Sequence, residues 1–152
     1  MNEHSELATA RLLDRLDGSG SDDEWVAVRE LRSSLGDSLP KYLLDRFCTA
    51  KKWGERSSYV FHATRYARRS HEAIALGKLA VRDKSKVVRY RGCMLLAYSL
   101  DRNLLPELEQ LLGSSQADSR ADIAAALDAI EQQNENYFVD RDHSGQLTLV
   151  VQ

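Results

Sequence analysis

A helical-hairpin pattern centred on Asp83–Arg89 is the feature that most constrains the fold of this chain. An apolar helical segment over 70–81 leads into a polar turn, and a second helix then runs through an apolar block over 85–100. A partial copy lies at Asp23–Arg29, and Arg120 opens another apolar helix 31 residues after Arg89. Units that recur about every thirty residues are typical of stacked helical hairpins.

The rest of the chain also reads as helices. Apolar residues recur at helical spacing between polar or glycine-containing breaks, and Ser21, Ser38, Ser70 and Ser85 stand where N-caps are expected. Connections of a few residues place consecutive helices side by side, as four antiparallel pairs. The predicted helices are 6–17, 21–35, 38–50, 56–68, 70–81, 85–100, 103–113 and 118–133.

The C-terminal segment has a different pattern. Two short apolar runs, Tyr137–Val139 and Leu147–Val150, flank a polar turn, which predicts a β-hairpin over about 136–151 that would cap the stack. The turn also resembles the first half of a calcium-binding EF-hand loop, with oxygen atoms at Asp140, Asp142 and Ser144 and a glycine at Gly145. The position of the closing glutamate is Val151, so a hairpin turn is favoured over a calcium site.

The turn aspartate six residues before Val88-Arg89 resembles the HEAT repeat, and the spacing resembles its short bacterial forms. The resemblance covers 70–132 and 21–35, whereas 38–68 lacks the Val-Arg pair. It implies an all-α fold: a right-handed α-solenoid of about four HEAT-like helix pairs, in a single domain over 1–152. It also implies a ladder in which turn aspartates pair with arginines. The residues expected in that ladder are Asp23, Arg29, Asp83, Arg89 and Arg120.

Charge is distributed unevenly along the chain. The net charge is −2 overall, but 51–91 carries +9 between segments of −4 and −7. Aromatic residues are interleaved with these cations, and arginine and aromatic side chains are enriched at binding hot spots. The candidate partner-binding residues are Lys51, Lys52, Trp53, Arg56, Arg65, Arg68, Arg69, Lys84, Lys86 and Arg91.

This basic centre has two interpretations. It is either a solvated rim that keeps the protein soluble or the footprint of a partner. A partner would be a protein with an acidic surface, or else a nucleic acid held through its phosphates. The acidic segments on both sides favour a compact acidic protein, because they would repel a long duplex.

Signals for chemistry are absent from the sequence. It contains no Gly-rich phosphate loop and no nucleophile elbow, and none of its histidines is paired at metal-ligand spacing. We therefore expect a non-enzymatic protein without cofactor or metal. In size and architecture the chain resembles the immunity proteins of interbacterial toxin systems, which implies a stoichiometric inhibitor that covers a toxin. A nucleic-acid-binding domain that uses the same basic surface is the alternative.

Composition indicates a cytoplasmic protein. No apolar run approaches the length of a membrane span, and residues 1–6 lack the apolar stretch of a secretory signal. Cys48 and Cys93 fall inside apolar helical patterns, so we expect both to be buried thiols in a reducing compartment.

Overall fold

The computed structural model describes residues 2–114 and 117–152, and its regular structure is helical, which confirms the predicted all-α class. None of the described helices is long and apolar enough to cross a membrane. The helices are α1 (Glu3–Asp14), α2 (Asp22–Leu35), α3 (Leu39–Thr49), α4 (Trp53–Ala63), α5 (His71–Ala80), α6 (Lys86–Ser99), α7 (Leu105–Ser114) and α8 (Arg120–Glu131).

Serine caps start several of these helices. Ser21, Ser70 and Ser85 each accept a hydrogen bond from the backbone N–H three residues later, so the predicted N-caps of α2, α5 and α6 are confirmed. The predicted cap at Ser38 is wrong. Its hydroxyl donates to the carbonyl of Leu35 at 2.7 Å, across a short 3-10 turn, η1 (Gly36–Ser38), that leads directly into α3.

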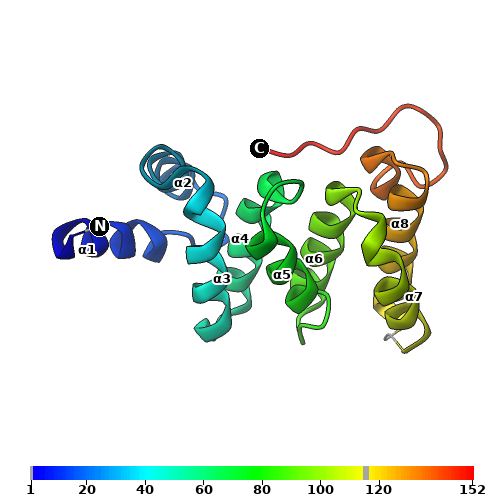
Figure 1. Ribbon diagram of the computed structural model, residues 1–152, viewed down its shortest axis with the longest axis horizontal. Helices are drawn as coiled ribbons and strands as arrows, with labels where there is room; N and C mark the ends of the chain where they lie inside the picture. Colours follow the sequence, from blue (N-terminus) through cyan, green and yellow to red (C-terminus); the bar gives the residue numbers. More distant parts are fainter. Residues whose placement is uncertain (1, 115–116) are drawn as a thin grey trace.

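Consecutive helices pack as neighbours and follow one another along the longest dimension of the molecule (Figure 1). α1 packs on α2, α3 on α4, α5 on α6 and α7 on α8, as short connections require. α4 also contacts α6, and α6 contacts α8, so these second helices form a continuous row. The buried apolar side chains form one core cluster along this row, from Leu13 to Phe138.

Two glycines let α5 and α6 approach closely. A Cβ atom at Gly92 would lie 2.7 Å from the backbone nitrogen of Val81 and 2.8 Å from the Cβ of Ala80. A Cβ atom at Gly77 would lie 2.8 Å from methyl groups of Leu95 and Leu96. A leucine side chain can move away from an added Cβ atom more easily than backbone can. Glycine is therefore required more strictly at position 92 than at position 77.

The predicted C-terminal β-hairpin is wrong, because residues 136–151 contain no strand. The first apolar run falls in the 3-10 turn η5 (Glu135–Phe138), where Phe138 is fully buried and its ring lies 5.3 Å from that of Tyr90. η5 contacts α6 and α8, so this turn, and not a β-hairpin, covers the end of the helix row. The following segment runs back along one side of the stack toward α2 (Figure 1), where Arg32 Nη2 donates to a main-chain oxygen of Gln152 at 2.8 Å.

Candidate functional site

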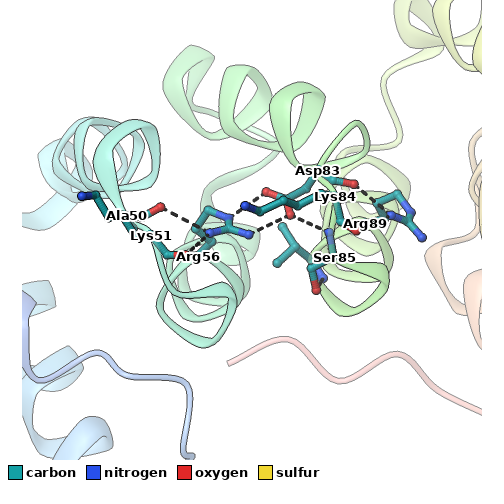
Figure 2. Close-up of polar contacts among 8 residues, drawn as sticks. Ala50, Lys51, Arg56, Asp83, Lys84, Ser85 and Arg89 are labelled. Carbon is teal, nitrogen blue, oxygen red and sulfur yellow. Dashed lines mark hydrogen bonds and ion pairs between the residues drawn. The ribbon is translucent and has the colours of Figure 1, made fainter.

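A buried ion pair joins two successive hairpins. Arg56, in the first turn of α4, binds Asp83 through Nε at 2.8 Å and Nη2 at 3.1 Å (Figure 2). Its Nη1 donates to the carbonyls of Ala50 at 3.3 Å and Lys51 at 2.9 Å. Both charged side chains are only 8% exposed. The arginine therefore ties its own turn to the turn between α5 and α6.

The same arrangement recurs 33 residues later, at Arg89 in the first turn of α6. Its Nη1 donates to the carbonyls of Asp83 at 2.9 Å and Lys84 at 3.0 Å, which lie six and five residues back, as for Arg56. Its Nη2 lies 3.1 Å from Asp118 Oδ2, and its Nε donates to Ser119 at 2.6 Å. We call Arg56, Asp83, Arg89 and Asp118 the ladder, which Figure 2 shows in part.

The ladder differs from the predicted one in its members. Asp83 and Arg89 belong to it, but the arginine that binds Asp83 is Arg56, which we had assigned to a partner. Asp23 instead pairs with Arg15 at 2.8 Å on the surface. Arg29 and Arg120 are exposed side chains outside the ladder. The 33-residue spacing of Arg56 and Arg89 is the sequence signal that could have identified Arg56 as the arginine that binds Asp83.

Arg91 lies over the Phe61 ring, and the other remaining candidate cations lie at two separate edges of the molecule. We call the edge formed by 50–53, 83–86 and 118–119 the ladder edge, because the ladder joins these turns. Lys51, Lys52, Lys84 and Lys86 are exposed there. Arg65, Arg68 and Arg69 follow the far end of α4, whose 11 residues span about 16 Å. The structure therefore does not bring the ten candidates into one footprint.

The ladder edge carries an exposed aromatic side chain. Trp53 opens α4 and is 56% exposed beside Lys51 and Lys52, over a depression of about 480 Å³ that Asp17 and Glu55 also line. A second depression of about 480 Å³ lies between α3 and α5 and is lined by residues that include Leu79 and Lys84. Among the described residues, no carboxylate pairs with the four lysines of this edge.

At the far end of α4, two arginines are already engaged. Arg68 donates to the carbonyl of Tyr98 at 2.8 Å, lies 4.1 Å from the Tyr98 ring centre, and approaches Glu135 at 3.4 Å. Arg69 pairs with Asp37 at 3.1 Å. These side chains connect neighbouring elements, which makes them weaker candidates for a partner than the lysines of the ladder edge.

A buried Glu24–His62 pair holds the loop between α1 and α2. Glu24 accepts from His62 Nε2 at 2.7 Å, from the Ser58 hydroxyl at 3.0 Å and from the backbone N–H of Gly18 at 2.8 Å. Burial alone would raise the pKa of Glu24, but the hydrogen bonds from His62, Ser58 and the backbone N–H of Gly20 outweigh it and hold the pKa below its ordinary value. Burial lowers the pKa of His62, so the pair is a carboxylate and a neutral imidazole.

This buried cluster is not arranged as a nucleophilic site. The Ser58 hydroxyl and the imidazole both bind the same carboxylate, so the imidazole is not placed to take the serine proton. Ser58 is also only 3% exposed. The cluster joins α2 to α4, and sequence reasoning missed it because its members are 34 to 38 residues apart.

The turn that resembles a calcium loop supplies hydrogen bonds to the carboxylate of its own Asp140. Asp140 accepts from the backbone N–H groups of Ser144 at 3.1 Å and Gly145 at 2.8 Å, and from the Ser144 hydroxyl at 2.6 Å. Hydrogen bonds from the Ser144 hydroxyl and these amides lower the pKa of Asp140. Within the part of the chain that the structure describes, no three His, Cys, Asp or Glu residues are grouped to hold a metal ion.

The two cysteines differ in exposure. Cys93 is buried, and burial raises the pKa of its thiol to about 12. Cys48 is exposed on α3, so the prediction that it is buried is wrong.

Comparison of the chain with protein-family models, curated proteins and solved structures gave no match.

Proposed function

We propose that this protein is a non-enzymatic binding module built as a short HEAT-like α-solenoid. The repeated arginine geometry supports this architecture, since Arg56 and Arg89 make the same backward contacts to carbonyls and each binds an aspartate of the next hairpin. Helical repeats of this kind present extended surfaces to partners. On this view the ladder is scaffold, and function lies in the exposed residues around it.

The ladder edge is the proposed docking surface, and the partner is a protein with an acidic surface. One observation carries the proposal: Trp53 is 56% exposed among lysines that form no ion pair with a carboxylate of the described chain. An exposed tryptophan supplies a large apolar contact, and unpaired lysines speed the approach of a negatively charged partner. Lys84 and Lys86 come from the next hairpin, which widens the surface beyond a single turn.

The biological role that fits this surface best is stoichiometric inhibition, as in an immunity-type protein that neutralises a toxin by covering it. Such a role needs a rigid surface and no catalytic group. The ladder supports rigidity, because its buried ion pair fixes two turns of the docking surface relative to each other. A partner bound in this way would be a cytoplasmic protein.

Capture experiments with charge-matched variants test the proposal. Tagged protein is incubated with native lysate, with and without nuclease, and proteins retained by wild type are identified by mass spectrometry. Lys52→Glu/Lys84→Glu should abolish retention of the partner, whereas Arg11→Glu/Lys41→Glu changes the net charge equally at exposed sites elsewhere. With the purified partner, the first variant should associate about tenfold more slowly at low salt.

Two outcomes would refute the proposal. Equal loss of the partner in both charge variants would mean that net charge, and not the ladder edge, controls binding. Loss of all retained material on nuclease digestion would instead favour the nucleic-acid alternative, in which the same lysines contact phosphates.

A further inference from the structure

Three arginines on successive hairpins form no ion pair with an aspartate or glutamate of the described chain. Arg32 lies on α2, Arg65 in the 3-10 turn η2 (Thr64–Tyr66) after α4, and Arg91 on α6. All three are partly buried, and across residues 2–114 and 117–152 none is in an ion pair. Partly buried cations without counter-ions destabilise a fold, so their retention points to a site that an anion completes.

The three arginines surround one small region. Arg32 lies two turns after Trp25 on α2, and Arg65 lies one turn after Phe61. Because Trp25 contacts Phe61 and Arg91 lies over the Phe61 ring, the three arginines lie on the same side of these helices. Burial lowers the pKa of Arg32, and the positive charge of Arg65 lowers it further. Arg32 and Arg91 both lower the pKa of the buried His62. The Nε atom of Arg32 is buried and, in the described structure, has no hydrogen-bond partner.

Aromatic rings line the same region. The Arg91 guanidinium lies 4.7 Å from the centre of the Phe61 ring and 5.8 Å from that of Tyr90. Trp25 packs edge-on against Phe61 at 6.0 Å. A pocket of about 160 Å³ opens here, lined by Trp25, Phe61 and Arg91 together with Glu24 and Ser58. The region therefore offers positive charge beside apolar ring faces.

The C-terminal segment already lies across this region. Two hydrogen bonds hold it: the backbone N–H of Leu149 donates to Asn136 Oδ1 at 2.9 Å, and a main-chain oxygen of Gln152 accepts from Arg32. Three extended residues reach about 10 Å, so 149–152 spans the gap between η5 and α2. Leu147 and Val150 remain 55% and 64% exposed, whereas Leu149 packs against the core, so the segment lies on the surface of the stack.

We propose that the face formed by Arg32, Arg65 and Arg91 binds an extended acidic segment of a partner protein, and that residues 146–152 cover this face in the free protein. The chain segment offers Arg32 a main-chain oxygen of Gln152, whereas Arg65 and Arg91 have no ion pair within the described residues. An acidic segment in the same path would bring carboxylates to all three arginines and could place apolar side chains on the aromatic rings. This site is separate from the ladder edge and does not depend on its function.

The test uses the full chain and a fluorescein-labelled peptide of alternating glutamate and valine, with fluorescence anisotropy as the readout. Asn136→Ala removes one anchor of the covering segment, so it should tighten peptide binding about fivefold. Arg65→Gln/Arg91→Gln should weaken binding about tenfold or more. Arg65→Lys/Arg91→Lys should restore part of that loss, and Arg11→Gln/Lys41→Gln, an equal charge change elsewhere, should have little effect.

Three results would overturn the proposal. Unchanged binding in Asn136→Ala would mean that the segment does not cover the site. Equal weakening by the arginine pair and by the control pair would mean that only net charge matters. Binding of a single-stranded oligonucleotide with the same arginine dependence, without binding of the peptide, would assign the face to nucleic acid. Lys52→Glu/Lys84→Glu should leave the effects of Asn136→Ala and Arg65→Gln/Arg91→Gln unchanged, which separates this test from that of the ladder edge.

Discussion

Replacing Arg56 with methionine tests the central claim that the ladder holds the stack together. Methionine keeps most of the side-chain length but removes four hydrogen bonds, two to Asp83 and two to the carbonyls of Ala50 and Lys51. Among the described residues it also leaves the Asp83 carboxylate, which is 8% exposed, with one donor, the backbone N–H of Ser85 at 2.8 Å. Breaking a buried ion pair from one side costs about 3–5 kcal/mol.

The free energy of unfolding, from urea titration, should therefore fall by about 3 kcal/mol or more in Arg56→Met. For a chain of 152 residues this corresponds to a melting temperature lower by about 10 °C. Asp83→Asn keeps an oxygen that can accept from the backbone N–H of Ser85 and removes the negative charge of the carboxylate. The double variant Arg56→Met/Asp83→Asn should consequently be more stable than the sum of the single effects predicts, by about 2 kcal/mol.

The surface pair Arg15–Asp23 provides the matched control. Its side chains are 35% and 66% exposed, and its closest N–O distance of 2.8 Å equals that of the buried pair. Water screens an exposed pair, so the same double-mutant cycle there should give a coupling energy below about 1 kcal/mol. Equal coupling energies in the two cycles would refute the claim that burial of the ladder stabilises the stack.

Three further predictions follow from packing, protonation and thiol exposure. Gly92→Ala should destabilise the protein by about 2 kcal/mol or more, because its Cβ meets backbone. Gly113→Ala, in a helix with open space around it, should stabilise by about 0.5 kcal/mol in the same urea titrations. Because the pKa of His62 lies below its ordinary value of 6.5, the unfolded chain binds more protons under mildly acidic conditions. The urea midpoint should then fall as the pH drops below about 6.5, and His62→Gln should remove that slope. Cys48 should react with a thiol reagent in the folded protein while Cys93 stays protected until unfolding, as mass spectrometry of the labelled chain would show.

The helices could be predicted from the sequence because their signals are local. Apolar spacing and the serines at the starts of α2, α5 and α6 act within a few residues, and the structure agrees with them. The prediction of a C-terminal hairpin was wrong because strand formation depends on contacts with distant parts of the chain. Whether an apolar run pairs as a strand depends on what else can bury it, and Phe138 finds a place against α6 and α8 in a 3-10 turn.

Residues of the site could be predicted only in part, because side-chain roles depend on contacts between distant hairpins. Arg56 and Lys52 look equivalent in the basic stretch of the sequence. Arg56 is buried in an ion pair with Asp83, which lies 27 residues further along the chain, whereas Lys52 is exposed. Glu24 and His62 lie 38 residues apart, and neither has a local feature that predicts a buried pair.

The ladder and the proposed docking surface are made from the same turns, and this has a physical consequence. Arg56 binds the carbonyl of Lys51 and the carboxylate of Asp83, so it sets the relative positions of the lysines that flank Trp53 and those of the next hairpin. A surface held in place before binding loses less conformational entropy when a partner docks. A buried ion pair is a weak source of stability compared with apolar packing of the same volume. Its geometry is directional, however, and a binding surface assembled from separate hairpins needs fixed geometry more than it needs additional stability. The basic stretch of the sequence therefore divides into two groups: buried arginines that fix the turns, and exposed lysines on those turns that form the proposed docking surface.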